Sequence, residues 1–146
     1  GPERAVAGGR KAKDVAGEAL AAAGFHTIER DVPMRAGVEV SFRALDGAGR
    51  PWHFEVWGAF STSRPGLKRI DTLWKALGRA SVLHAAEPDL RLVLLTTDVP
   101  AATSAGGRAL AEVVGRGRRH TITDVVRLLD ADDVLRLKEL ATGGEA

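Results

Sequence analysis

Two short segments in the first half of the chain alternate strictly between apolar and polar residues. They run from Val38 to Phe42 and from Trp52 to Trp57, on either side of the glycine-rich turn Asp46–Gly49. A two-residue period around such a turn is typical of a β-hairpin. We expect one face of this hairpin to be apolar. That face would carry Val38, Val40, Phe42, Trp52, Phe54 and Val56.

The opposite face of the predicted hairpin gathers polar side chains from both strands. Its members would be Glu39, Ser41, His53, Glu55 and Trp57. Side chains on alternate positions of two adjacent strands lie close together on one face of a sheet. This face is therefore where we expect the chemistry of the protein.

The remaining elements follow from the spacing of apolar residues and from turn residues. Residues 90–97 form a nearly continuous apolar run, which indicates a central strand covered on both faces and parallel to its neighbour. Residues 122–129 predict a last strand or a buried segment. The other predicted elements are a strand at 25–32 and helices at 10–23, 66–84, 106–114 and 130–140. This order predicts an α/β fold with a mixed central sheet flanked by helices.

The helix predicted at 66–84 has two distinct faces. Its apolar residues recur at helical spacing and predict a core face made of Leu67, Ile70, Leu73, Trp74 and Leu77. Basic residues follow the other side, and with the preceding loop they are Arg64, Lys68, Lys75 and Arg79. Such a stripe is either a solvated surface or a face that contacts phosphates.

Composition excludes several kinds of protein. The 146 residues include no cysteine, so disulfides, thiolate metal sites and thiol catalysis are ruled out. No apolar run reaches the roughly 20 residues of a membrane span, and no signal peptide is visible, so we expect a cytoplasmic location. The net charge is only +2, so any case for nucleic-acid binding depends on where the charges lie.

The length predicts a single domain. We expect it to cover residues 3–141, with Gly1-Pro2 as a protease-cleavage scar and residues 142–146 as a flexible tail. The sequence leaves open whether this domain belongs to a larger parent protein.

Three segments carry a resemblance to a known superfamily. They are Asp14–Phe25 in the first helix, Gly37–Ala44 in the first hairpin strand and Trp52–Gly58 in the second. In this order they resemble the restriction-endonuclease-like PD-(D/E)XK nucleases, and within them the Holliday-junction-resolvase-like branch. The resemblance implies a three-layer sandwich whose hairpin carboxylates hold Mg²⁺ or Mn²⁺ for phosphodiester cleavage.

The motif of these nucleases is only partly present. By resemblance, Glu55 stands at the acidic position of the second strand, Ser41 replaces the aspartate of the first strand, and Trp57 replaces the lysine. Glu39 lies two residues before Ser41 and is an alternative ligand. If the protein is active, the resemblance implies Glu55, Glu39 and Asp14 as metal ligands.

The missing lysine has a candidate replacement on the helix at 66–84. Lys68 or Lys75 could take its place, as helix cations do in some relatives of these nucleases. The catalytic set would then comprise Glu55, Glu39, Ser41 and Lys68.

Three functions therefore stay open. The first is a DNA-binding domain with a degenerate active site. Its contacts would be Arg64, Lys68, Lys75, Arg79, Trp57 and the basic loop residues Arg116, Arg118 and Arg119. The second is an active Mg²⁺- or Mn²⁺-dependent endonuclease. The third is a protein-interaction or oligomerisation module, as a homodimer or within a larger DNA-processing or defence protein.

Overall fold

The structure is a computed structural model that describes residues 2–58 and 66–144, with side chains from residue 11 onward. Its helices are α1 (Pro2–Ala23), α2 (Ile70–Ala86), α3 (Ala105–Val113) and α4 (Ala131–Ala141), with a short 3₁₀ turn, η1 (Gly66–Lys68), before α2. Its strands are β1 (His26–Pro33), β2 (Glu39–Leu45), β3 (Pro51–Trp57), β4 (Leu92–Thr96) and β5 (Asp124–Arg127). The first helix thus begins earlier than its sequence pattern predicts.

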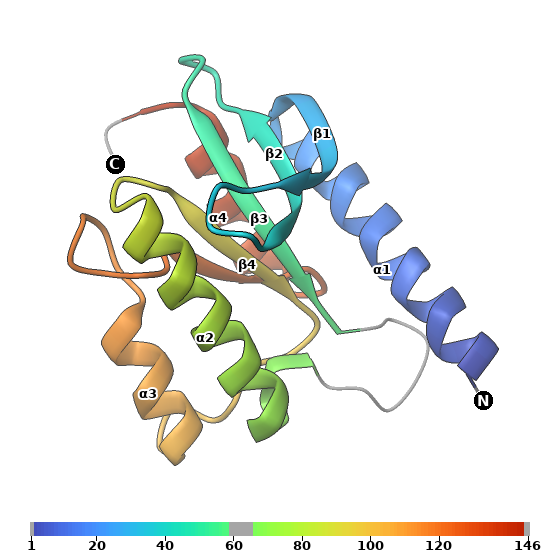
Figure 1. Ribbon diagram of the computed structural model, residues 1–146. Helices are drawn as coiled ribbons and strands as arrows, with labels where there is room; N and C mark the ends of the chain where they lie inside the picture. Colours follow the sequence, from blue (N-terminus) through green and yellow to red (C-terminus); the bar gives the residue numbers. More distant parts are fainter. Residues whose placement is uncertain (1, 59–65, 145–146) are drawn as a thin grey trace.

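The five strands form one open mixed sheet in the order β1-β2-β3-β4-β5 (Figure 1). The pairs β1–β2 and β2–β3 are antiparallel, whereas β3–β4 and β4–β5 are parallel. Helices α2 and α3 lie between the parallel strands in sequence, as crossover connections require. The predicted α/β class, with a mixed central sheet flanked by helices, is confirmed.

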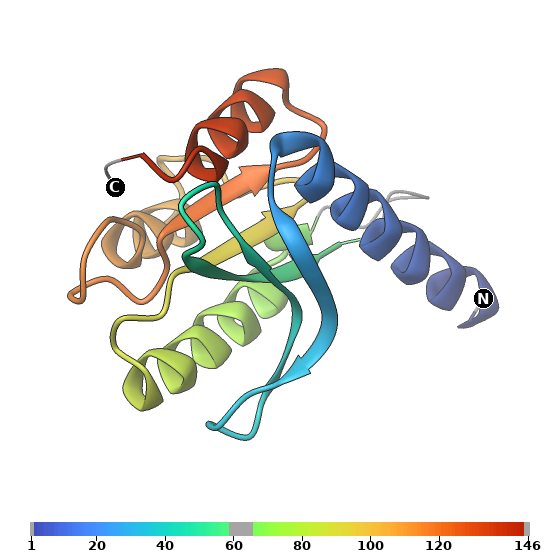
Figure 2. The same ribbon diagram turned by 90° about the horizontal axis from the view of Figure 1, so that it is seen from above.

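Helices cover both faces of the sheet (Figure 2). Leu20 of α1 and Leu137 of α4 pack in one buried cluster with the aromatic side chains of the hairpin. Leu73 of α2 and Leu110 of α3 belong to a second cluster on the other face. Every residue of β4 is buried, so the prediction of a central strand covered on both sides is confirmed.

The predicted apolar face of the hairpin is correct for four of its residues and wrong for two. Phe42, Trp52, Phe54 and Val56 pack toward α1 and α4. Val38 and Val40 instead pack on the α2 side of the sheet. The alternation breaks because β2 pairs with β3 only from Phe42 to Leu45. Before Phe42, the Ser41 hydroxyl accepts a hydrogen bond from the backbone N–H of Val56.

Helix α2 is rotated relative to its predicted orientation. Leu67 and Leu73 are buried as expected, but Ile70 and Trp74 are 53% and 55% exposed. The buried stripe of α2 consists of Leu73, Ala76, Ala80 and Leu83. Alanines complete this stripe because they let the helix backbone approach the sheet, which leaves the larger apolar residues on the outer side.

The end of the chain meets the hairpin turn. The Arg50 guanidinium donates to the carbonyls of Gly143 and Gly144, and the Gly47 N–H donates to the carbonyl of Ala141. Residues 142–144, which the sequence assigns to a flexible tail, thus contact the turn between β2 and β3. Within the described part of the chain, no helix has the length and apolarity that crossing a membrane demands.

Candidate functional site

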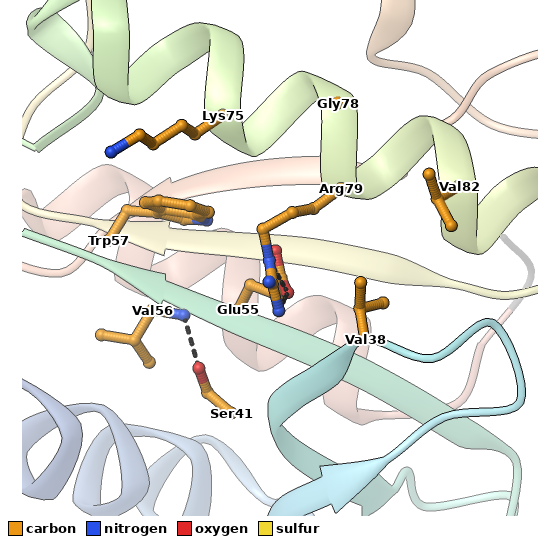
Figure 3. A pocket seen from close by; sticks show the side chains of 9 residues that line it. All are labelled: Val38, Ser41, Glu55, Val56, Trp57, Lys75, Gly78, Arg79 and Val82. Atoms are coloured by element: carbon orange, nitrogen blue, oxygen red, sulfur yellow. Dashed lines mark hydrogen bonds and ion pairs between the residues drawn. The ribbon is translucent and has the colours of Figure 1, made fainter.

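A groove of about 590 Å³ lies between α2 and the end of β3 (Figure 3). Its residues come from α2 on one side and from the hairpin on the other. They are Lys75, Gly78, Arg79 and Val82 from the helix, and Val38, Ser41, Glu55, Val56 and Trp57 from the hairpin segment. This volume is within the range of pockets that hold small ligands or single groups of a polymer.

The groove exists because β2 and β3 separate at this point. Their ladder ends at the pair Phe42–Phe54, while β3 continues to Trp57 along β4. The Ser41 hydroxyl lies 3.0 Å from the Val56 nitrogen and satisfies one N–H that would otherwise lack a strand partner. Glu55 and Trp57, near the end of β3, therefore face α2 from the floor of the groove.

A buried ion pair joins the floor of the groove to the helix. Arg79 Nε and Nη2 lie 2.9 Å and 2.8 Å from Glu55 Oε1. The Glu55 side chain is only 3% exposed, whereas that of Arg79 is 37% exposed. Arg79 also donates to the backbone carbonyl of Glu39, so its guanidinium links α2 to both hairpin strands.

Burial raises the pKa of the Glu55 carboxyl above its usual value, and the hydrogen bond and charge of Arg79 oppose this rise. The nearby Trp57 indole also opposes the rise in the pKa of this carboxyl. Its N–H does not reach the geometry of a hydrogen bond, so Trp57 Nε1 and Glu55 Oε2 are both buried and have no hydrogen-bond partner among the described residues. The groove thus contains one hydrogen-bond donor, the Trp57 N–H, and one acceptor, Glu55 Oε2, that make no hydrogen bond within the described residues.

Five of the residues that the sequence predicts for the site come together in this groove. They are Ser41, Glu55, Trp57, Lys75 and Arg79. Figure 3 shows Lys75 and Arg79 reaching down from α2 toward the Trp57 and Glu55 side chains on β3. An aromatic ring, two cations and one carboxyl therefore share a single open space.

Asp14, Glu39 and Lys68, which the sequence also predicts for the site, do not line the groove. Asp14 forms an ion pair with Arg30 at 3.0 Å, on the side of the sheet that α1 covers. Glu39 is exposed and does not line the groove, and neither does Lys68 in η1. Arg64 lies outside the described residues.

The predicted basic loop is also separate from the groove. Arg116 and Arg118 line a smaller cavity of about 220 Å³ beside Asp89, which follows the C-terminal end of α2. Arg118 forms an ion pair with Asp89 at 3.0 Å, and both side chains are largely exposed. Arg119 is exposed on the same loop. These three arginines form a second basic surface rather than part of the groove.

Carboxylates are scarce among the described residues that line the groove. Magnesium sites are built from carboxylates and other oxygen ligands, together with water or substrate phosphates. Glu55 is the only carboxylate among the residues that line the groove, and Arg79 occupies one of its oxygens. Within the described ranges, no three His, Cys, Asp or Glu side chains lie together in a group that could hold a metal ion.

Val38, Gly78 and Val82 line the groove but are not among the site residues predicted from the sequence. Val38 lines the groove although its position in the alternating pattern predicts the opposite face. Gly78 and Val82 form the upper wall, and the helical period of α2 could have indicated them because they follow Trp74 at intervals of four residues. The Glu55–Arg79 contact depends on how α2 docks, which no local pattern encodes.

Comparison of the chain with protein-family models, with curated proteins and with solved structures found no match. The class that the structure itself defines is an α/β protein with a five-stranded mixed open sheet and helices on both faces.

Proposed function

We propose that this chain is a nucleic-acid-binding domain of the restriction-endonuclease-like superfamily that holds a strand in the α2–β3 groove without cutting it. The observation that carries the proposal is the composition of the groove, in which Trp57, Lys75 and Arg79 line one open space. Aromatic faces beside cations suit single-stranded nucleic acid, because bases stack on the ring while phosphates pair with the cations.

The cations of the groove differ in their availability. Lys75 is exposed at the mouth, so its ammonium is free to approach a phosphate. Arg79 is held by Glu55 but keeps 37% of its side chain exposed. We therefore assign the main phosphate contact to Lys75 and a supporting one to Arg79.

The same geometry argues against cleavage. A hydrolytic site needs a carboxylate that is free to hold a metal ion, whereas one Glu55 oxygen is bound by Arg79 at 2.9 Å. A lysine does stand in the groove, at position 75 instead of 68. This lysine favours the active endonuclease as the second candidate function, and one assay separates the two.

The experiment measures binding of labelled single-stranded, duplex and branched DNA at several salt concentrations, with and without Mn²⁺. We expect shifted but uncut DNA, with the tightest binding to single strands. Lys75→Ala should reduce the slope of log affinity against log salt by about one, as one lost phosphate contact predicts. Lys138→Ala is the matched control, because Lys138 is an exposed lysine on α4, across the sheet.

Three results would count against the proposal. If none of the DNA substrates were shifted at low salt, nucleic acid would not be the ligand. If Lys75→Ala and Lys138→Ala weakened DNA binding equally, the binding would be a nonspecific effect of surface charge and not a property of the groove. Cleavage that requires Mn²⁺ and disappears in Glu55→Gln would identify an active endonuclease instead.

A further inference from the structure

We propose that α2 is a self-association surface through which two copies of this chain form an antiparallel two-fold dimer. This inference goes beyond nucleic-acid binding and does not depend on it. Its basis is an apolar ridge on the outer side of α2, made of Ile70, Trp74, Gly78 and Val82, which we call the α2 ridge.

The members of the α2 ridge are spaced by four residues, so they form one continuous row along the helix. Ile70, Trp74 and Val82 are 53%, 55% and 47% exposed. The stripe of α2 that packs on the sheet lies on the other side and consists of Leu73, Ala76, Ala80 and Leu83. Figure 1 shows α2 in front of the sheet.

Gly78 makes this ridge suitable for another helix. A Cβ added at Gly78 would meet nothing within 4 Å, so no contact with the described residues of the monomer requires a glycine there. Glycine in the middle of an exposed helix destabilises it relative to alanine. A gap in a row of large apolar side chains also lets a second helix backbone approach closely.

Trp74 and Val82 lie at equal distances on either side of Gly78, which makes a second copy the partner that this part of the ridge fits. In an antiparallel pair that crosses at Gly78, Trp74 of one copy would face Val82 of the other, on both sides of the axis. Such a self-complementary contact is the kind of interface that two-fold dimers form. Rows of this spacing pack against each other in the commonest class of helix crossing.

The charges at the ends of α2 favour the antiparallel orientation. Lys68 precedes the helix and Glu87 follows it, and both positions are at least partly exposed, whereas Arg69 and Asp89 already pair with Asp71 and Arg118. Antiparallel pairing places the basic end of each helix beside the acidic end of the other and opposes the two helix dipoles. Because Gly78 and Val82 also line the groove, each groove would border the dimer interface.

The absence of cysteine from the chain allows a direct test by cross-linking. A residue on a two-fold axis lies next to its own copy, so Gly78→Cys should form a disulfide-linked dimer under mild oxidation. Trp74→Cys and Val82→Cys should each cross-link poorly alone, but efficiently when the two variants are mixed. Leu135→Cys is the matched control, because Leu135 is 56% exposed on α4, across the sheet.

Sedimentation equilibrium of the full chain gives the second measurement. We expect the unmodified protein to show twice the monomer mass at high micromolar concentration. Trp74→Ser should weaken association at least tenfold, whereas Leu135→Ser should leave it unchanged. Gly78→Ala should raise the melting temperature measured at low concentration but still weaken association, since its methyl group separates the helices.

The cross-linking and sedimentation results together decide whether the dimer forms. Selective cross-linking at residue 78 together with weaker association of Trp74→Ser supports the dimer. A protein that stays monomeric at 100 µM, or cross-linking no faster at residue 78 than at residue 135, overturns it. Association is tested with Trp74→Ser and DNA binding with Lys75→Ala, and Trp74 does not line the groove, so the failure of one proposal is distinguishable from that of the other.

Discussion

Arg79 on α2 neutralises the carboxyl of Glu55, which is almost fully buried at the end of β3. The two side chains approach to 2.8 Å, and the carboxyl is 3% exposed. This contact joins the helix to the hairpin at the floor of the groove. It also determines which charge the groove presents, because Glu55 is the only acid among the described residues that line it.

Removal of Arg79 should destabilise the fold, because Glu55 is then buried without a positive partner. We expect Arg79→Met to lower the free energy of unfolding by about 2–3 kcal/mol, because it leaves Glu55 buried without a counter-charge. Glu55→Gln in the same chain should recover at least half of this loss. Urea denaturation of the two single variants and the double variant measures this coupling.

The pH dependence of Arg79→Met provides an independent check. Burial already raises the pKa of Glu55, and loss of Arg79 should raise it further. A carboxyl whose pKa is higher in the folded state stabilises the fold at low pH and loses this contribution as the pH rises. The defect should therefore shrink as the pH falls toward 5, and a defect that stays constant with pH would contradict this account. Arg108→Met, an exposed change on α3, is the control.

His53 should make the fold sensitive to acid. Burial, aided by the charge of Arg43, lowers the pKa of His53 from 6.5 to about 4. Between these values the unfolded chain binds a proton that the folded chain does not, so stability decreases as the pH falls. From pH 7 to pH 5 this effect should amount to about 2 kcal/mol.

His53→Gln isolates this contribution, because glutamine does not titrate. The unfolding free energy of the variant should change less between pH 7 and pH 5, by about the same 2 kcal/mol. His84→Gln changes a histidine on α2 outside the buried strand and should retain the dependence of the unmodified chain. Identical pH profiles for the His53 variant and the unmodified protein would show that His53 is not the titrating group.

Elements whose pattern is local could be predicted from the sequence. The hairpin was visible because a glycine-rich turn separates two alternating segments. The central strand was visible because Leu92–Thr96 are buried on both faces and nearly all apolar. The cap of the last helix was also visible, since the Asp130 side chain accepts a hydrogen bond from the Asp133 N–H. Each of these signals lies within a few residues of the feature it predicts.

Features that depend on how a helix packs against the sheet could not be predicted from local sequence patterns. Both sides of α2 carry apolar residues, so its period does not say whether Trp74 or Ala80 faces the sheet. The break in alternation at Ser41 depends on a hydrogen bond to Val56 across the hairpin. Five predicted site residues still meet in the groove, because Ser41, Glu55 and Trp57 belong to the hairpin whatever the rotation of α2. Asp14 does not join them, because α1 covers the other face of the sheet.

The buried Asp46 should be a main support of the hairpin turn. Its Oδ2 accepts from the Trp52 indole at 2.9 Å, and its Oδ1 accepts from the N–H groups of Ala48 and Arg50. Burial raises the pKa of Asp46, but these hydrogen bonds outweigh it and the net pKa is lowered. Stability from this group is therefore present at neutral pH and is lost as the pH falls through the lowered pKa.

Asp46→Asn should lower the free energy of unfolding by about 2 kcal/mol, because the amide NH₂ would face the Trp52 donor. Trp52→Phe removes that donor, so the double variant should be less destabilised than the sum of the two single changes. A double-mutant cycle by urea denaturation measures this difference, and strict additivity would show that the indole contact contributes nothing.

Two glycines should respond to alanine in opposite directions. A Cβ at Gly107, near the start of α3, would lie 2.0 Å from the carbonyl oxygen of Ala101, a backbone atom that cannot move without displacing the loop before the helix. Gly107→Ala should therefore destabilise the protein by about 2–3 kcal/mol. A Cβ at Gly78 has open space, so Gly78→Ala should stabilise the monomer by up to about 1 kcal/mol through helix propensity. Thermal unfolding at low protein concentration compares the two, and a melting temperature that Gly107→Ala leaves unchanged would mean that the loop from Ala101 to Ser104 gives way without cost.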